Sequence, residues 1–231
     1  MKTTIVIPTY NEAESILGTI EEIFRHAPED VRLLIVDDQS PDGTADIVMN
    51  TFSVHPRVAV IRRTNPRSFA QSYIEGFKVA LADPATEAVF EMDADLSHHP
   101  QYLPALMSAL LDNDVVIGSR YVPGGDISNF SWHRKLISRA ANTYARTLTR
   151  LPILDITGGF VGYRRHVLEH IPFHAIQSDG YGFQIEMKHH AHRAGARFAE
   201  IPIIFRDRYN GYSKFSKKMI LEALRIGWRL R

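Results

Sequence analysis

AVFEMDADLS, residues 88–97, carries a signal for the fold and a signal for the chemistry in one stretch. Its first six residues form a short, almost continuously apolar run, as expected for a strand that is covered on both faces of a sheet. The run ends in the acidic pair Asp93 and Asp95. In open α/β sheets, ligands bind beyond the carboxyl ends of the strands. The stretch therefore predicts a buried strand that leads into a binding site.

Four further apolar runs of this kind occur in the first half of the chain. They are TTIVIP, RLLIVDD, RVAVIR and DVVIGS, at residues 3–8, 32–38, 57–62 and 114–119. The segments between them place apolar side chains at helical spacing, as in the sets Ile16, Ile20, Ile23, Phe24 and Leu103, Leu106, Leu110, Leu111. Strands that alternate with helices predict an α/β fold, with a mainly parallel central sheet flanked by helices.

The second half of the chain is less regular. Residues 132–150 and 181–194 are predicted to form helices, the first of them basic, and residues 198–205 a strand. Gly-rich turns lie at residues 123–126 and in DITGGF, residues 155–160. We find no internal repeat and no domain boundary, and the length of 231 residues is that of one domain. We therefore expect residues 1–231 to form a single domain.

The composition excludes several classes of function. The formal net charge of +1 creates no overall field toward nucleic acid, so we expect no nucleic-acid partner. The absence of cysteine rules out disulfides, thiolate metal sites and cysteine nucleophiles. A predicted strand begins at Thr3, which leaves no room for a signal peptide. No apolar run approaches the roughly 20 residues that span a bilayer. We therefore expect a cytoplasmic protein that is soluble or sits on a membrane surface.

Polar clusters follow four of the five predicted strands, at residues 8–12, 37–42, 93–97 and 119–120. Any one of these clusters has an ordinary explanation in turn chemistry. SPDG, residues 40–43, is a good turn followed by a helix start. Four clusters at the same edge of a sheet are better explained by a binding site.

Asp93 and Asp95 are candidates to share one divalent cation. Mg²⁺ and Mn²⁺ favour oxygen ligands, and Mg²⁺ is usually held by one or two carboxylates with substrate phosphates completing its shell. Such an ion would stabilise the charge that develops on a diphosphate leaving group. His98 and His99 follow directly, and we expect them to lie beside this site or to begin the helix before Pro100.

Two other clusters suit a nucleotide. IPTYNE, residues 7–12, and VDDQSPDGT, residues 36–44, offer acidic and amide groups for hydrogen bonds to a nucleobase and a ribose. The sequence contains neither GxGxxG nor a phosphate-binding P-loop pattern, which disfavours a Rossmann dehydrogenase and a P-loop kinase.

The motifs occur in a recognisable order along the chain: IPTYNE, VDDQSPDGT, EMDADLSH, GSRYVPGG, DITGGF, SDGYGFQIE and RYNGYSK. In this order they resemble the family 2 glycosyltransferases of the GT-A fold, from residue 4 to about residue 222. The resemblance is greatest to the dolichol- and polyprenol-phosphate mannosyltransferases. It implies a metal-dependent hexosyltransferase that moves mannose from GDP-mannose onto dolichyl or polyprenyl phosphate, with Mg²⁺ or Mn²⁺ as cofactor.

The resemblance also implies roles for individual residues. The residues that would bind the nucleotide sugar are Pro8, Tyr10, Glu12, Val36, Asp38, Asp93, Ala94, Asp95, Ser97, Arg120, Arg208 and Lys214. Asp93 and Asp95 would bind the metal, and Ser97 occupies a position that completes the metal shell. The residues that would hold the acceptor phosphate are Arg120, Arg134 and Ser138. Asp95 and Arg120 would be the catalytic residues.

Elementary chemistry agrees with this assignment. The acceptor is a phosphate monoester that is already anionic, so the reaction needs no strong general base. It does need two anionic phosphates brought together, which requires a metal and Arg or Lys side chains. We expect direct in-line attack with inversion, which gives a β-linked product from an α-linked donor. Asp155 is a candidate to orient the acceptor or the sugar, or else a turn residue before Gly158. Glu186 is a further candidate.

The sequence departs from the family pattern in two places. Residues 63–77, RTNPRSFAQSYIEGF, lack the Lys and Gly-rich stretch that relatives usually carry beside the donor site. Val161 follows GGF where relatives commonly have Arg, which predicts one cationic contact fewer. Three alternatives stay open: UDP-glucose or another nucleotide sugar as donor, a different acceptor such as a growing polysaccharide, or a membrane-associated binding subunit without activity. Against the last alternative stands the presence of Asp93, Asp95, Arg120 and Lys214.

The C-terminal segment predicts a basic amphipathic helix over about residues 215–231. From residue 214 onward it contains six Lys or Arg and one acidic residue, and its apolar face is formed by Ile220, Leu224 and Trp228. Such a helix either lies in an anionic membrane interface, near a lipid-linked acceptor, or packs on the domain. We therefore expect peripheral contact with the cytoplasmic face of a membrane. Three histidines of the preceding helix are interpreted as solvated surface: His189, His190 and His192.

Overall fold

The computed structural model describes residues 1–128, 131–206 and 229–230. Arg208 and Lys214 fall outside these ranges, as does the predicted C-terminal helix apart from Arg229 and Leu230. The predictions that concern them stay predictions. In the part of the chain that the structure describes, no helix is both long and apolar enough to cross a membrane.

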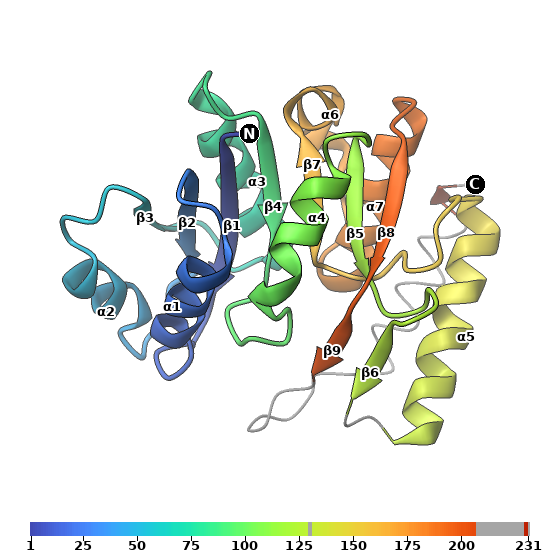
Figure 1. The fold of residues 1–231 in the computed structure, drawn as a ribbon, viewed down its shortest axis with the longest axis horizontal. Coiled ribbons are helices and arrows are strands. Elements are labelled where there is room, and N and C mark those ends of the chain that lie inside the picture. Colours follow the sequence, from blue (N-terminus) through green and yellow to red (C-terminus); the bar gives the residue numbers. More distant parts are fainter. Residues whose placement is uncertain (129–130, 207–228, 231) are drawn as a thin grey trace.

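A seven-stranded sheet forms the centre of the molecule (Figure 1). Its strands lie side by side in the order β3 (Val58–Arg62), β2 (Val31–Asp37), β1 (Thr3–Thr9), β4 (Ala88–Glu91), β7 (Val161–Arg164), β5 (Val115–Ser119) and β8 (Phe198–Pro202). All neighbours are parallel except for β7, which runs antiparallel to β4 and β5. All five strands predicted in the first half are present, and the mainly parallel α/β sheet is confirmed.

Helices cover both faces of this sheet (Figure 1). They are α1 (Ile16–His26), α2 (Thr44–Thr51), α3 (Phe69–Ala82), α4 (Leu103–Ala109), α5 (Trp132–Thr149), α6 (Arg165–His170) and α7 (Gly180–Arg193), with short 3₁₀ turns at Pro100–Tyr102 and Phe173–Ala175. Side chains alternate between the two faces along each strand. In β1, Ile5 and Ile7 pack with α1 and α4, whereas Val6 packs with α3. Both faces are therefore buried, which is why the strands are continuous apolar runs in the sequence.

Gly76 lets α3 approach the sheet closely. A Cβ atom at this position would lie 2.4 Å from Cγ1 of Val6 and 3.1 Å from Cγ2 of Val36. Only glycine allows such an approach without displacing β1 and β2. The loop that precedes α3 is thereby brought to the carboxyl end of β2.

The second half of the chain differs from the sequence prediction. The strand expected at residues 198–205 is two strands, β8 and β9 (Ile204–Arg206), and β9 pairs with β6 (Asp126–Ser128) in a second small sheet. The break lies at Ile203, which donates its N–H to the Ser119 carbonyl (3.0 Å) and accepts the Asp126 N–H (3.0 Å). Strand β7 is not among the strands predicted from the sequence. Leu111, expected on the apolar face of α4, lies beyond the end of this helix and is 61% exposed.

Candidate active site

The loops after β1 and β2 are joined to each other by hydrogen bonds. Thr9 Oγ1 donates to Asp37 Oδ2 (3.0 Å), and the Asp38 N–H donates to the Thr9 carbonyl (2.9 Å). Farther along, the Glu12 N–H donates to Thr44 Oγ1 at the start of α2 (3.0 Å). The first two polar clusters of the sequence therefore form one connected edge.

Asp38, a predicted nucleotide ligand, holds the loop at residues 63–68. Its Oδ1 pairs with the Arg63 guanidinium, and its Oδ2 accepts the Ser68 N–H (2.9 Å). Arg63 is buried, and its Nε lies 3.1 Å from Oε1 of Glu75. The loop that departs from the family pattern is thus attached to the edge where the nucleotide is predicted to bind.

The same loop also reaches Tyr10. The Arg67 guanidinium lies over the Tyr10 ring, 3.1 Å from its centroid, in a cation–π arrangement. Tyr10 is half-buried, as are Pro8 and Glu12. Val36 is fully buried within β2, and its side chain packs against α3 at Gly76 rather than facing the edge. The structure therefore does not bring the Val36 side chain to the predicted nucleotide site.

Asp93, Ala94 and Asp95 follow β4, the strand next to β1. Ala94 is buried, and its carbonyl accepts a hydrogen bond from the Thr19 hydroxyl of α1 (2.8 Å). Oδ1 of Asp95 accepts two hydrogen bonds from Ser97, one from its N–H (3.0 Å) and one from its Oγ (2.6 Å). The Ser97 hydroxyl therefore faces Asp95 and fixes one oxygen of its carboxylate.

The atoms at this strand end are of the kind that a hard divalent cation prefers. Asp93, Asp95 and Ser97 offer carboxylate and hydroxyl oxygens, which suit Mg²⁺ and Mn²⁺. The Asp93 side chain is 30% exposed, so it is accessible from solution. Nowhere in residues 1–128, 131–206 and 229–230 do three or more His, Asp or Glu side chains gather to hold a metal ion.

His98 and His99 lie where we expected them, one beside the predicted metal site and the other at the start of the helical turn at Pro100. His98 lies beside Asp93: its Nδ1 accepts the Asp93 N–H (3.2 Å), and its buried ring stacks on Phe160 with 5.2 Å between centroids. His99 begins the 3₁₀ turn at Pro100–Tyr102, where its Nδ1 accepts the Gln101 N–H (3.2 Å).

Arg120, at the carboxyl end of β5, is bound by Asp155. Both residues are buried. The carboxylate accepts hydrogen bonds from the N–H (3.0 Å), Nε (2.7 Å) and Nη2 (2.7 Å) of Arg120, and from the Gly158 N–H (2.9 Å). Nη2 donates in addition to Thr157 Oγ1 (2.9 Å). Asp155 thus forms the turn before Gly158, which is one of the two roles expected for it. It also fixes Arg120, a predicted phosphate ligand.

The two groups hold each other in the charged state. Burial raises the pKa of the Asp155 carboxyl, but the charge and hydrogen bonds of Arg120 outweigh burial and lower this pKa below its ordinary value. Burial likewise lowers the pKa of the Arg120 guanidinium, and Asp155 raises it above its ordinary value. Asp155 binds the edge of the guanidinium that carries Nε and Nη2. Nη1 donates no hydrogen bond within the described part of the chain.

The turn after β5 packs directly on the backbone of Arg120. A Cβ atom at Gly125 would lie 2.5 Å from the Ser119 carbonyl oxygen and 2.9 Å from the carbonyl carbon of Arg120. Because both neighbours are backbone atoms, they have little freedom to move aside. This contact explains the need for glycine in GSRYVPGG and fixes the Arg120 backbone from a second side.

Arg134 and Ser138 lie on α5, which is held against the same segment. The hydroxyls of Tyr121 and Ser138 are 2.8 Å apart, and Nζ of Lys135 lies 2.9 Å from Oδ1 of Asp126. Ser138 is therefore placed next to the residue that follows Arg120, and its role at the acceptor phosphate stays a prediction.

Tyr181, in the first turn of α7, is a candidate site residue that sequence reasoning did not single out. Burial raises the pKa of its phenol, while the charges of Arg120 and Arg134 lower this pKa and the charge of Asp93 raises it. The phenol therefore lies within electrostatic reach of a predicted metal ligand and of two predicted acceptor ligands. The motif SDGYGFQIE marked this segment without singling out Tyr181.

The structure places Glu186 and Val161 in structural roles. Glu186 is buried, and its carboxylate accepts the N–H groups of Gln177 (2.9 Å) and Ser178 (3.2 Å) and pairs with Arg229. It thereby ties the segment before α7 to the end of the chain. Val161 is the first residue of β7 and is fully buried in the core that α3 and α7 cover.

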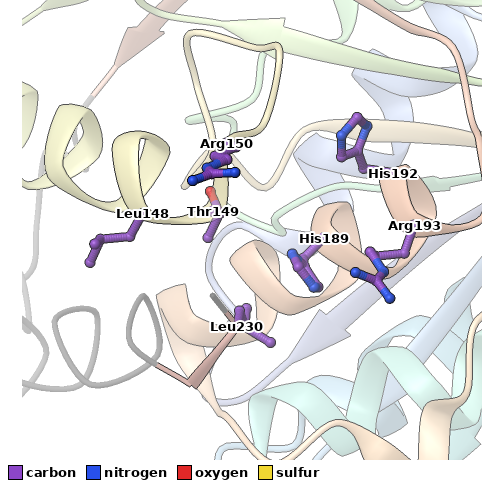
Figure 2. A pocket seen from close by; sticks show the side chains of 7 residues that line it. All are labelled: Leu148, Thr149, Arg150, His189, His192, Arg193 and Leu230. Carbon is purple, nitrogen blue, oxygen red and sulfur yellow. The ribbon is translucent and has the colours of Figure 1, made fainter.

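The histidines of α7 are half-buried, and the prediction that they are solvated surface is wrong. Burial lowers the pKa of His189 and of His190, and neighbouring basic groups lower both further. Two of these histidines help to line a pocket of about 320 Å³ between the ends of α5 and α7. Figure 2 shows the side chains that line it: Leu148, Thr149, Arg150, His189, His192, Arg193 and Leu230.

The sheet and the site at its strand ends define a class of protein, the glycosyltransferases of the GT-A fold, and comparison with known families agrees. The chain belongs to glycosyl transferase family 2, whose family model matches residues 4–172. The resemblance drawn from the motifs is thereby confirmed at the level of the family.

Relatives of this chain can be named individually. It is 42% identical to an undecaprenyl-phosphate mannosyltransferase of Micrococcus luteus, over 97% of this chain and 91% of the relative. It is also 42% identical to a polyprenol monophosphomannose synthase of Mycolicibacterium smegmatis, over 96% of this chain and 84% of the relative. A dolichol-phosphate mannosyltransferase of Pyrococcus furiosus is 37% identical, over 100% of this chain and 64% of the relative.

Solved structures share the fold at lower identity. Glucosyl-3-phosphoglycerate synthase from Mycobacterium tuberculosis, in complex with Mg²⁺ and UDP, is 18% identical with a TM-score of 0.72, over 100% of this chain and 80% of that one. A mannosyltransferase from Pyrobaculum calidifontis, in complex with GDP-Man and Mn²⁺, is 20% identical with a TM-score of 0.61, over 92% of this chain and 58% of that one. At these identities the likeness establishes the fold alone.

Proposed function

We propose that this protein transfers mannose from GDP-mannose to the phosphate of a polyprenyl or dolichyl lipid, with inversion at the anomeric carbon. The names of the three relatives all combine mannose with a polyprenol-type lipid carrier. The Pyrobaculum structure, which shares the fold, contains GDP-Man and Mn²⁺. These findings support the sugar, the acceptor class and the use of a divalent metal.

The observation that carries the proposal is that the proposed donor and acceptor residues follow strands whose carboxyl ends lie at one edge of the same sheet. Asp93 and Asp95 follow β4, Arg120 follows β5, and the hydroxyl of Tyr121, next to Arg120, lies 2.8 Å from that of Ser138 on α5. Transfer between two phosphates needs both substrates in one place. A common edge of one sheet supports such a joint site.

Asp93 and Asp95 would hold Mg²⁺ or Mn²⁺, with phosphates of the donor completing the shell. Ser97 would keep the Asp95 carboxylate in a fixed orientation, because its hydroxyl donates to Oδ1. The hydroxyl oxygen retains lone pairs with which it can also complete the metal shell, as predicted. When bound, the cation supplies stabilisation of the negative charge on the departing diphosphate.

Arg120 would bind phosphate through Nη1 while Asp155 holds the opposite edge of its guanidinium. Arg134 and Ser138 would complete the acceptor site from α5. The acceptor oxygen is already anionic, so no residue has to remove a proton from it. This oxygen attacks the anomeric carbon in line, and the bond from that carbon to the diphosphate oxygen breaks. Beyond the described residues, we keep Arg208 and Lys214 as further phosphate contacts.

For the nucleotide we propose the edge formed by Pro8, Tyr10 and Glu12, with the loop at residues 63–68 as its wall. Asp38 holds that loop through Arg63 and the Ser68 N–H. Asp38 would therefore affect nucleotide binding by fixing the position of the loop. The altered loop is therefore attached at the donor site by a buried ion pair, which supports a role for it in the choice of donor.

We further propose that the protein works at the cytoplasmic face of a membrane, where a lipid-linked acceptor resides. On α5, Trp132, Leu136 and Ile137 are exposed, at 72%, 60% and 45%. Arg134 and Lys135 lie between them in the sequence. Apolar and basic side chains together suit an anionic lipid surface.

A thermal-shift titration tests the donor site. We expect GDP and GDP-mannose to stabilise the protein in the presence of Mn²⁺, and UDP and UDP-glucose to have less effect, because a ligand that binds the folded state raises its stability. The Asp95→Ala variant should lose the Mn²⁺-dependent part of this shift. If no nucleotide stabilises the protein in a metal-dependent way, the donor site is wrongly assigned.

Transfer of labelled mannose to a short polyprenyl phosphate tests the acceptor. Asp95→Ala should abolish transfer. Arg134→Ala should raise the KM for the lipid phosphate and leave GDP binding unchanged, and Arg139→Ala, an exposed change on the same helix, is the matched control. An effect of Arg134→Ala on GDP affinity rather than on the acceptor would contradict the assignment.

A further inference from the structure

A series of buried polar groups begins at the end of β4, behind the proposed metal site. Glu91 is the last residue of β4 and is fully buried. Its Oε2 accepts a hydrogen bond from the side-chain amide of Gln184. The side-chain carbonyl of Gln184 in turn accepts a hydrogen bond from Nζ of Lys188 (3.2 Å). Gln184 and Lys188 lie one turn apart on α7 and are both buried, so the amide sits between a carboxylate and an ammonium group.

The series continues from Lys188 to the turn that holds Arg120. Nζ of Lys188 donates to the Gly158 carbonyl (2.7 Å), and the Gly158 N–H donates to Oδ1 of Asp155 (2.9 Å). Asp155 binds the Arg120 guanidinium through both of its oxygens. One residue, Gly158, therefore separates the ammonium group from the ion pair of the active site.

This connection spans a gap that the sheet itself does not bridge. The metal-binding segment follows β4 and Arg120 follows β5, but these strands are not neighbours, because β7 lies between them in the opposite direction. No backbone ladder therefore sets the end of β4 directly against the end of β5. Gln184 and Lys188 reach both ends from α7.

A lysine at this position is not explained by core packing. Burial lowers the pKa of the Lys188 ammonium to about 8, while the nearby charges of Glu91, Asp155 and Glu200 raise it and that of Arg120 lowers it. An apolar side chain of similar volume fills such a core without this desolvation cost. What an apolar side chain cannot do is donate to the Gly158 carbonyl and to Gln184.

We propose that Lys188 and Gln184 are positioning residues, which hold Asp155, and through it Arg120, in register with the metal-binding end of β4. The inference rests on the proposed function, in which Asp93 and Asp95 hold the metal and Arg120 binds phosphate.

The Lys188→Met variant tests the proposal, because methionine keeps the length of the side chain and removes its hydrogen bonds. We expect kcat for mannose transfer to fall on the order of 10²-fold, the effect of a small misplacement at a reacting centre. Mn²⁺-dependent GDP binding should change little, since Tyr10, Asp38 and Asp93 are not in the series. Ile185→Ala is the matched control: it alters a fully buried residue of the same helix that makes only apolar contacts, and it should leave kcat within about twofold when assayed well below its Tm.

The NMR signal of the Arg120 Nε–H group gives a readout that does not depend on activity. It is assigned by its absence in Arg120→Lys. Lys188→Met should shift or broaden this signal, and Ile185→Ala should not. An unchanged Arg120 signal in Lys188→Met overturns the proposal, whatever the activity shows, and so does an equal kcat loss in Ile185→Ala.

If Lys188→Met does not fold, Gln184→Met provides the same two readouts, because it removes the amide from between Glu91 and Lys188 and keeps the lysine. If the unmodified protein transfers no mannose but Lys188→Met still changes the Arg120 signal, the proposed function fails and the positioning of Arg120 stands.

Discussion

Replacing Asp155 by asparagine should destabilise the protein strongly, and the structure allows the cost to be worked out. The carboxylate accepts four hydrogen bonds, two on each oxygen: Oδ2 from the N–H and Nε of Arg120, and Oδ1 from Nη2 of Arg120 and from the Gly158 N–H. An asparagine amide turns one of these oxygens into a donor. In either orientation two hydrogen bonds are lost, and two N–H groups face an N–H group.

The loss also leaves Arg120 as a buried charge without its counter-charge. Hydrogen bonds to charged groups are each worth about 1.5–3 kcal/mol, and breaking a buried ion pair from one side costs about 3–5 kcal/mol. We therefore expect the free energy of unfolding to fall by about 3–5 kcal/mol, out of a total of about 5–15 kcal/mol for a domain. For a chain of this size, this corresponds to a Tm lower by roughly 10 °C.

Urea denaturation at pH 7 measures this quantity. The pKa of Asp155 is lowered in the folded state, so its contribution is fully present at pH 7 and is lost only as the pH falls through that lowered pKa. Asp126→Asn is the control, because Asp126 also pairs with a cation, Lys135, but its side chain is 52% exposed. An exposed pair contributes about 0–1 kcal/mol. If Asp155→Asn costs no more than Asp126→Asn, the ion pair does not have the structural role that we assign to it.

Three further changes test other parts of the site. Ser97→Ala removes the hydroxyl that fixes Asp95. Calorimetry in the presence of GDP should show Mn²⁺ affinity lower by about 10-fold or more. Unchanged affinity would show that the 2.6 Å hydrogen bond from Ser97 Oγ to Asp95 Oδ1 is dispensable. Gly125→Ala forces a Cβ to within 2.5 Å of the Ser119 carbonyl oxygen. It should lower the free energy of unfolding in urea by about 1–3 kcal/mol and reduce transfer activity. If the variant is unaffected, the turn can shift freely. Arg63→Met breaks the buried pair with Asp38 and should lower GDP affinity more than Mn²⁺ affinity; equal losses would place the 63–68 loop outside the donor site.

The first half of the fold could be predicted because its information is local. β1, β2 and β4 are buried on both faces, so each is a continuous apolar run that stops where polar residues begin. A charged residue lies within one of these apolar runs. Glu91 lies inside the β4 run, and its Oε2 is hydrogen-bonded by Gln184, which is 93 residues away in the sequence.

The second half could not be predicted in the same way because its elements depend on distant partners. β7 has four residues, and its direction is set by pairing with β4 and β5 rather than by its own sequence. The break between β8 and β9 arises from hydrogen bonds of Ile203 to Ser119 and Asp126, far earlier in the chain. Neither feature leaves a local pattern.

For the site, residue types indicated the chemistry but not the partners. The sequence predicts that Arg120 contacts phosphate, and it allows two roles for Asp155. Their mutual binding, across 35 residues of sequence, is visible only in the structure. Asp38 shows the same limit, because the sequence predicts a nucleotide ligand at this position but does not show that its carboxylate holds Arg63 and the loop behind it.

The Arg120–Asp155 pair also bears on how two anionic substrates would be drawn to one site. Because Asp155 neutralises Arg120, the pair adds no net positive charge, and the contribution that we propose for it in phosphate binding is the fixed direction of the guanidinium. Attraction for two phosphates must then come from a metal on Asp93 and Asp95, from Arg134, and from the predicted contacts at Arg208 and Lys214. With a formal net charge of +1, the chain as a whole supplies little of this attraction. We therefore expect the affinities for the donor and for the acceptor both to depend on the divalent metal. The affinity for the acceptor would then depend on the aspartate pair at the end of β4.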